Sequence, residues 1–195
     1  KPFFFCFLRD VRPSMPRVGL RFFLIAPGGL VTEFLANQGV EFETKTFSAQ
    51  RLAQSSHVSG HEVAKTVLLL TGAGDHAIAV LPADRGVDLE KVAQVLGDGK
   101  VSIASEFDIS QLFLDCELGV IPPFGSRYGL PAVVDAMLAA DEQIVFEGNT
   151  HHDAVRINFQ DYCKVEQPLV VDIAEFTGVG HAQCGDSQFP SSRPY

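Results

Sequence analysis

Residues 63–81 read VAKTVLLLTGAGDHAIAVL, and this stretch decides the fold. Two runs rich in Val, Leu, Ile and Ala lie on either side of the segment 72–75, which contains two glycines. Runs of this length and composition favour β-strands, and a short glycine-containing segment between them favours a tight turn. The stretch therefore predicts a hairpin of two central strands, over 63–71 and 77–81.

The segments on both sides of the hairpin alternate between helical and strand-like patterns. Helices are predicted where apolar residues recur every three or four positions between a polar cap and a glycine. They are expected from Leu30 to Gly39, from the cap Ser48 to Ser55, over 89–96 between Asp88 and Gly97, from the cap Ser105 to Phe113, and near Asp161. Further strands are expected at 40–47, 101–104, 133–134, 144–146, 155–159 and 169–173. This order predicts one α+β domain over residues 28–176, with helices packed around a mixed sheet.

The two ends of the chain differ from this core in composition. Residues 1–27 hold five Lys and Arg against a single acid, Asp10, and two aromatic clusters flank a proline-rich middle. Two interpretations of this N-terminal extension stay open: a targeting segment, or translated upstream sequence with Met15 as the real start. Residues 177–195 are rich in Gly, Ser, Pro and Gln, so we expect a disordered tail.

The composition excludes several classes of protein. Hydrophobic residues make up 46% of the chain, as in a packed core, and no apolar run approaches the roughly 20 residues that cross a bilayer. The four cysteines lack paired short spacing, so we expect reduced thiols, a cytoplasmic location, no metal and no cofactor. Residues 30–176 carry 9 Lys and Arg against 22 Asp and Glu, a balance of −13. Because such a field repels a phosphate backbone, we expect no DNA partner, and any RNA must be met through a small patch.

Lys65 is the charged residue of the hairpin that needs an explanation. An unpaired ammonium is costly to bury, so Lys65 reaches solvent, pairs with a carboxylate, or points into a ligand cleft. Asp135, at the end of a predicted strand, could be the carboxylate that holds it charged. His151 could offer a proton or a hydrogen bond near neutral pH, or it could be a solvated loop residue.

The segment 119–125, GVIPPFG, is a second candidate for chemistry. Its two prolines, Pro122 and Pro123, restrict the backbone, while the glycines at its two ends allow unusual torsion angles. A stiff loop of this kind can direct free backbone N–H groups at an oxyanion or at a ligand carbonyl. It can also be a tight turn with no further role.

Taken together and in order, these motifs resemble a known family. The segments VAKTVLLL, LPAD, GVIPPFG, YGLPAVVD, IVFEGNTHH and VRI, within residues 30–175, closely resemble the YbaK family of aminoacyl-tRNA deacylases and the editing insert of bacterial prolyl-tRNA synthetases. The resemblance implies a mixed, partly closed sheet surrounded by helices. It also implies that the partner is the acceptor end of a mischarged tRNA, and that the ester to the wrong amino acid is hydrolysed.

The resemblance also implies a set of site residues. It places the family's central lysine at Lys65 and the histidine of its G-T-H pattern at His151. The glycine of its G-x-x-x-P loop falls on Gly119, and Pro123 closes that loop. This chain departs from the pattern at Asn149, where a glycine is usual. The expected catalytic residues are Lys65, Gly119 and His151, and the expected substrate-binding residues are Pro122, Pro123, Phe124, Gly125, Ser126, Tyr128 and Asp135.

Hydrolysis of such an ester needs no nucleophilic side chain, because water can attack once the ester is fixed and its carbonyl polarised. In this scheme the N–H groups around Gly119 hold the carbonyl, and Lys65 neutralises nearby negative charge. A covalent route through Cys116 or Cys163 lacks a recognised nucleophile motif. The main alternative is a binding module that captures an aminoacyl-adenosine-like ligand, or acts in a regulatory complex, without turnover.

Overall fold

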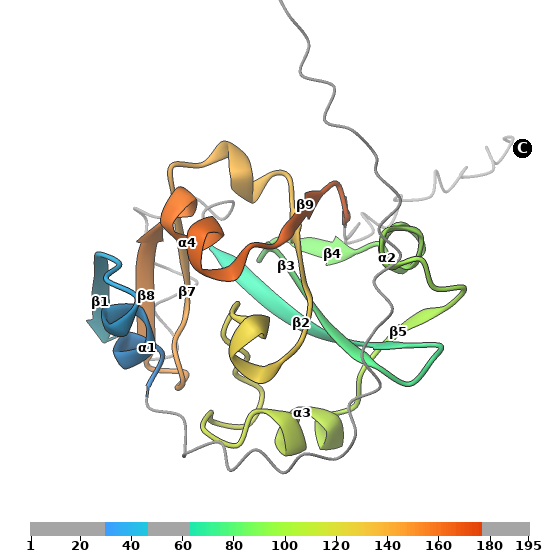
Figure 1. Ribbon diagram of the computed structural model, residues 1–195, viewed down its shortest axis with the longest axis horizontal. Coiled ribbons are helices and arrows are strands. Elements are labelled where there is room, and N and C mark those ends of the chain that lie inside the picture. The colour runs from blue at the N-terminus through green and yellow to red at the C-terminus, as the bar shows by residue number, and fades with distance from the viewer. Residues whose placement is uncertain (1–29, 47–62, 177–195) are drawn as a thin grey trace, which may run out of the picture.

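The computed structural model describes residues 30–46 and 63–176. Strands run through the middle of this part of the chain, and short helices lie around them (Figure 1). The helices are α1 (Val31–Asn37), α2 (Leu89–Leu96), α3 (Glu106–Leu112) and α4 (Phe159–Glu166), with the 3-10 helices η1 (Gly125–Tyr128) and η2 (Leu138–Ala140). The expected α+β class is confirmed.

The central hairpin has the expected form. Strands β2 (Ala64–Thr71) and β3 (His76–Pro82) are antiparallel, and the N–H of Gly74 donates to the carbonyl of Thr71 in the turn between them. The hairpin is the middle of a five-stranded sheet of order β5-β2-β3-β6-β9. In this sheet β5, β2 and β3 are antiparallel, whereas β3, β6 and β9 are parallel. The other strands of this sheet are β5 (Val101–Ile103), β6 (Ala132–Asp135) and β9 (Leu169–Val171).

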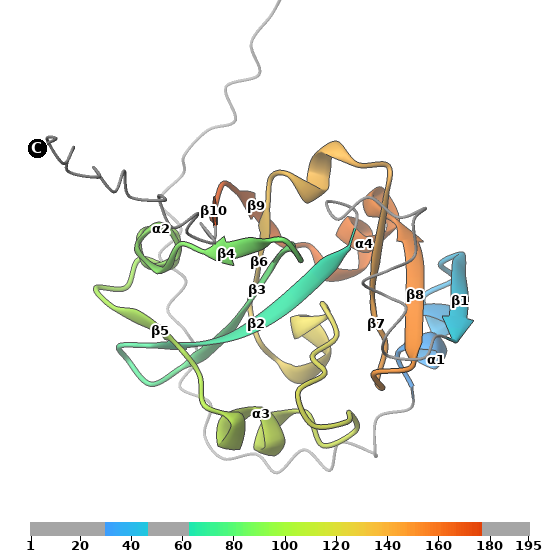
Figure 2. The ribbon, with the colours of Figure 1, turned by 180° about the vertical axis from the view of Figure 1, so that it is seen from behind.

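A three-stranded antiparallel sheet lies beside the start of β2 (Figures 1 and 2). Its order is β1-β8-β7, with β1 (Phe42–Thr46), β8 (Asp153–Asn158) and β7 (Gln143–Glu147). One isolated parallel bridge, between Val63 and Val145, joins this sheet to the chain entering β2. Among the described residues the two sheets therefore meet at a single bridge, and together they form one partly closed surface.

Two clusters of buried side chains hold the sheets and helices together. Residues alternate along β2, so Leu68 packs into the first cluster and Leu69 into the second. The first cluster takes side chains from both sheets and from α1 and α4, and it contains Phe124 and Tyr162. The second cluster lies under α2, where Val92 is fully buried. Both faces of the hairpin are therefore covered along most of its length.

The helix ends follow the capping signals of the sequence. The Asp88 carboxylate accepts the N–H groups of Glu90 and Lys91 at the start of α2, and Gly97 ends that helix in the left-handed conformation, with φ +68°. Ser105 forms a capping box with Asp108 at the start of α3. These local bonds satisfy N–H groups that a helix leaves unpaired at its start. Because such caps are visible in the sequence, the starts of both helices could be predicted correctly.

The structure differs from the sequence-based expectation at short elements. The two-stranded sheet of β4 (Arg85–Val87) and β10 (Ala174–Phe176) was not expected, because three residues are too few to show an alternating pattern. Phe159 was expected to end a strand, but Asn158 caps α4 and makes Phe159 its first residue. In the described residues, no helix has the length and apolar character needed to cross a bilayer.

Several expectations concern residues outside the described ones. They are the N-terminal extension 1–27, the helix from Ser48 to Ser55 and the tail 177–195. The domain boundaries at 28 and 176 accordingly stay a prediction.

Candidate functional site

Gly119 begins the proline-containing loop in a conformation that favours glycine, with φ +89°. Pro122 and Pro123 are buried, and the Tyr162 hydroxyl donates a 2.9 Å hydrogen bond to the carbonyl of Pro123. The far end of the loop is therefore fixed to α4. Within the described residues, the N–H of Gly119 donates to no other group. It is free to donate to a ligand.

His151 lies directly against this glycine. A Cβ atom on Gly119 would be 4.0 Å from the imidazole ring. The ring Nε2 is 3.1 Å from the carbonyl oxygen of Leu118, and because a carbonyl only accepts, Nε2 carries the proton. The backbone N–H of His151 donates to the Glu117 carboxylate at 2.9 Å, and Nδ1 is 3.6 Å from the Glu147 carboxylate. The expected proximity of Gly119 and His151 is thus present.

The contact from His151 determines where the Gly119 N–H points. The peptide between Leu118 and Gly119 is planar and trans, so its C=O and N–H groups point in opposite directions. His151 holds the carbonyl on one side of the peptide, which fixes the N–H of Gly119 on the other. In this arrangement the Nε2 proton is already used, so His151 acts here as a clamp on the loop.

Lys65 projects from the second residue of β2, and its Nζ donates to the carbonyl of Ala83 at 3.3 Å. Val63 and Val145 form an isolated parallel bridge, and Lys65 and Glu147 each lie two residues further along their own strands. Glu147 in turn contacts His151. Among the described residues, however, no hydrogen bond or ion pair joins Lys65 to Gly119 or to His151. That the three share one pocket stays a prediction.

The residues after the prolines are largely structural. Phe124 is fully buried, and its ring lies 5.5 Å from those of Phe34 and Phe146. Ser126 is exposed, but its hydroxyl and N–H both donate to the Glu166 carboxylate, at 2.6 and 3.1 Å. Burial raises the pKa of Glu166, and the two bonds from Ser126 oppose that change. These contacts hold the loop to α4 and give substrate binding no direct support.

Gly125 is a position where glycine is required by space. A Cβ atom there would lie 2.6 Å from the carbonyl oxygen of Leu130 and 3.1 Å from Ile78. We expect Gly125→Ala to lower the free energy of unfolding by about 1–3 kcal/mol, measured by urea denaturation. Gly99→Ala is the control, because nothing lies within 4 Å of its Cβ position, and it should change stability by under about 0.5 kcal/mol. Equal stability of the two variants would contradict this reading of the site.

Asp135 and Tyr128 also have partners within the fold. The Asp135 carboxylate is fully buried and accepts the N–H groups of Met137, Ile173 and Ala174 at 2.7–2.9 Å. In place of the suggested pairing with Lys65, these backbone contacts tie the end of β6 to the start of β10. The Tyr128 hydroxyl donates to the Asp115 carboxylate at 3.0 Å, and burial raises its pKa.

Neither Cys116 nor Cys163 shows a sign of activation. Burial raises the pKa of Cys116 and that of Cys163, so both are protonated near neutral pH. Cys116 lies 3.6 Å from the Tyr128 hydroxyl, inside a polar network. No three His, Cys, Asp or Glu side chains gather to hold a metal within the described ranges.

Sequence reasoning missed the residues that support the corner formed by Gly119 and His151. Asp115, Glu117 and Asn149 all bond to it or to each other. Their signal in the sequence was weak, because a polar residue in a loop is usually solvated. The departure from the family pattern at Asn149 was the one visible indication.

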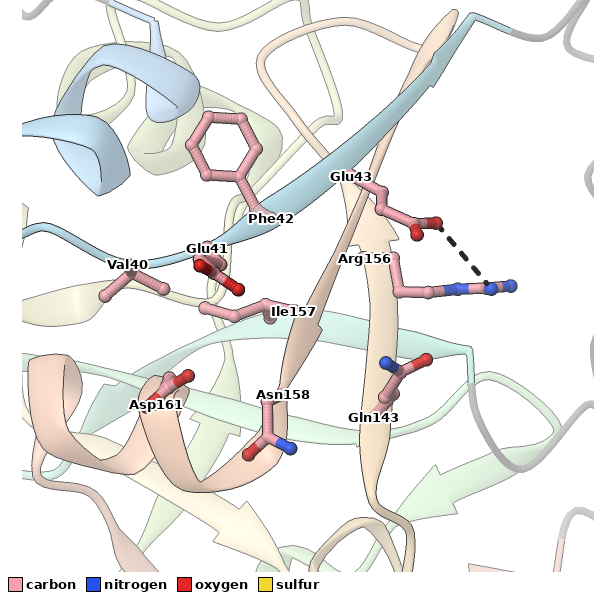
Figure 3. Close-up of a pocket in the computed structure, with 9 residues that line it drawn as sticks. All are labelled: Val40, Glu41, Phe42, Glu43, Gln143, Arg156, Ile157, Asn158 and Asp161. Atoms are coloured by element: carbon pink, nitrogen blue, oxygen red, sulfur yellow. Dashed lines mark ion pairs between the residues drawn. The ribbon is translucent and has the colours of Figure 1, made fainter.

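The described surface also carries a cavity away from this corner. It has a volume of about 680 Å³ and opens between β1, β8 and the start of α4 (Figure 3). Glu41, Glu43 and Asp161 give it an acidic lining, and Arg156 lies 3.9 Å from Glu43. Neither Lys65, Gly119 nor His151 lines it. This cavity is therefore separate from the candidate site.

The fold is the one expected for an aminoacyl-tRNA editing domain, and Gly119 and His151, both expected in its site, lie side by side. Comparison with known families agrees with this class. The family model described as "Aminoacyl-tRNA editing domain" matches residues 43–165, and the chain belongs to this family. At the level of the family, the expectation of an editing hydrolase is confirmed.

The relatives with known names support the same assignment. The multifunctional Ser/Thr-tRNA deacylase ProXp-y of Escherichia coli (strain K12) is 27% identical over 146 residues, which span 71% of this chain and 87% of the relative. Its counterpart in Escherichia coli O157:H7 matches equally.

Solved structures share the fold. The hypothetical protein APE2540 has a TM-score of 0.67 at 20% identity, over 74% of this chain and 99% of that one. A protein assigned as a trans-editing enzyme for prolyl tRNA synthetase has a TM-score of 0.64 at 18% identity, over 74% of this chain and 94% of the other. At these identities the likeness concerns the fold.

Proposed function

We propose that this protein hydrolyses the ester bond of mischarged tRNA in trans, and so removes wrong amino acids before translation uses them. The observation that carries the proposal is the corner at Gly119, where an N–H group without a partner among the described residues is aimed by the contact between His151 and Leu118. A fixed donor of this kind stabilises an oxyanion at low reorganisation cost. Because the chain belongs to the editing-domain family, we propose that this oxyanion forms from the carbonyl of an aminoacyl-tRNA ester.

The reaction needs water, the ester and this donor. Water adds to the carbonyl carbon, and the Gly119 N–H donates a hydrogen bond to the carbonyl oxygen, on which negative charge develops. The tetrahedral intermediate then collapses, the bond from carbon to the ribose oxygen breaks, and a proton derived from water passes to that oxygen. Free amino acid and uncharged tRNA leave. Neither Cys116 nor Cys163 is needed, in agreement with their raised pKa values.

Lys65 supplies the positive charge in this proposal. Its ammonium has three N–H donors, and one of them is used by the Ala83 carbonyl. Among the described residues nothing else accepts from this ammonium, and we propose that its other two donors serve a substrate oxygen, either of the ester or of the terminal phosphate. The acidic balance of −13 over residues 30–176 limits contact with the remaining tRNA, so we propose that binding is confined to the acceptor end. The cytoplasmic location expected from the reduced thiols stays a prediction.

The amino acid removed is proposed to be small. The E. coli relative is named for Ser and Thr, and we extend this to a small set: Ser, Thr, Ala and Cys. One methylene in a pocket changes discrimination by about 1–3 kcal/mol, so neighbouring sizes are separated by a factor of about 10–200.

Purified protein should release amino acid from tRNA charged wrongly with one of these four residues. The measurement is the loss of labelled aminoacyl-tRNA over time, against the slow spontaneous rate without protein. Correctly charged tRNAs carrying large residues such as Phe are the control and should persist. If every charged tRNA in a broad panel decays at the spontaneous rate but binds the protein, the alternative of a binding module replaces this proposal.

A further inference from the structure

We infer that Asn149 is a positioning residue that fixes the corner formed by Gly119 and His151. The inference rests on the proposed function for its effect on catalysis, but its structural part can be tested without it. Asn149 is 5% exposed, and both ends of its side-chain amide are bonded. An amide buried in this way is normally fully paired.

The amide of Asn149 joins three separate parts of the chain. Its Oδ1 accepts the N–H of Val31 at 2.6 Å, at the start of α1, where Leu30 provides no side-chain cap. Its Nδ2 donates to the backbone carbonyl of Asp115 at 3.1 Å and to the Asp115 carboxylate at 3.3 Å. The orientation of the amide follows from its partners, because the N–H of Val31 only donates and the Asp115 oxygens only accept. Its backbone carbonyl accepts the N–H of Glu117 at 2.8 Å.

These bonds fix both halves of the corner. Asp115 and Glu117 lie just before Gly119, and Asn149 lies two residues before His151. Glu117 closes the connection, since its carboxylate accepts the N–H of His151. Asn149 therefore fixes the distance between the segment that carries the free N–H and the histidine that aims it.

The Asp115 carboxylate is itself held from the other side. Arg127 donates to it at 2.7 Å and Tyr128 at 3.0 Å, and its side chain is 16% exposed. Asn149 thus bonds to a carboxylate that other residues hold in place, so this bond can fix Asn149 relative to Asp115.

The backbone gives no reason for a glycine at position 149. Among the described residues other than glycine, Gln167 alone has positive φ, so Asn149 lies in an ordinary region. Gly148 would also accept a Cβ atom, whose closest contact would be 3.5 Å from the carbonyl of Asp153. The asparagine is therefore tolerated without strain, and its side chain adds contacts that a glycine cannot make.

The test compares Asn149→Ala and Asn149→Gly with wild type in the deacylation assay. Both variants lose the side-chain bonds and keep the backbone bond to Glu117. We expect kcat to fall about 10- to 100-fold while KM stays within about twofold. The substrate should still bind, but the Gly119 N–H should no longer point at its carbonyl oxygen. Asn158→Ala is the matched control. It also removes an amide that accepts a helix N–H, at α4, but does not touch the corner, so its kcat should not change.

A spectrum of protein labelled with ¹⁵N-glycine separates this inference from the proposed function. The Gly119 amide signal should shift or broaden in both Asn149 variants, while those of Gly74 and Gly97, which also have positive φ, stay in place. If wild type deacylates nothing, the proposed function fails, and the Gly119 signal still decides the inference. An unmoved Gly119 signal overturns it, whatever happens to kcat.

If neither variant folds, wild type itself provides the measurement. The side-chain amide protons of Asn149 should exchange slowly with solvent and show cross-peaks to the Val31 N–H. Fast exchange without these cross-peaks overturns the inference.

Discussion

Lys65→Ala should lower kcat/KM for deacylation by at least about 100-fold while the circular dichroism spectrum stays that of wild type. The loss is expected because the Lys65 ammonium is proposed to stabilise the negative charge that develops on the substrate in the transition state. The fold should survive, because the side chain makes a single described hydrogen bond, to the carbonyl of Ala83. Initial rates over a range of mischarged tRNA concentrations measure the effect.

Lys164→Ala is the matched control for this variant. Lys164 is exposed and pairs with Asp161 on α4. Its removal changes the net charge by the same single unit, so both variants alter long-range attraction to tRNA equally. We expect its kcat/KM to stay within about twofold of wild type. A Lys65→Ala protein that works at the rate of this control would remove Lys65 from the mechanism.

The second large effect is expected from Gly119→Ala, with a loss of about 100-fold in kcat. Alanine at φ +89° is strained by about 1–2 kcal/mol, and relief of that strain rotates the peptide whose N–H is the proposed donor. Removal of one such donor typically costs a factor of about 10²–10³. Single-turnover deacylation with excess enzyme measures the chemical step directly.

Gly74→Ala provides a control with the same backbone strain. Gly74 also has φ +89°, but it lies in the turn between β2 and β3, with nothing within 4 Å of its Cβ position. Both variants should therefore lose similar stability, and only Gly119→Ala should lose activity. Similar activities for the two variants would show that the conformation of Gly119 has no catalytic role.

Much of the fold could be predicted because its signals are local. The hairpin of β2 and β3 follows from two apolar runs and a short turn, and α2 follows from Asp88 and Gly97. The parallel pairing of β6 with β3 and β9 could not be predicted, since nothing in those short segments encodes their partner. Strand pairing over long distances depends on packing that only the complete chain provides.

Only some of the residues expected in the site are placed where they could meet a ligand. Gly119 and His151 were found because a resemblance over many motifs selected them, and the structure brings them into contact. Phe124 and Asp135 were expected to bind substrate, but both are fully buried and make internal contacts. A sequence shows which residues are available for chemistry, whereas exposure and partners decide which of them can meet a ligand.

The single bridge between Val63 and Val145 determines how the surroundings of Lys65 can change. Beyond that bridge, the separation of Lys65 and Glu147 is set by how the two sheets pack on the first cluster, which includes Leu68 and Phe146. Because protein interiors are closely packed, the loss or gain of a methyl group there is expected to change how the two sheets meet. The surroundings of Lys65 can therefore change through substitutions in the core, with Lys65 itself left unchanged.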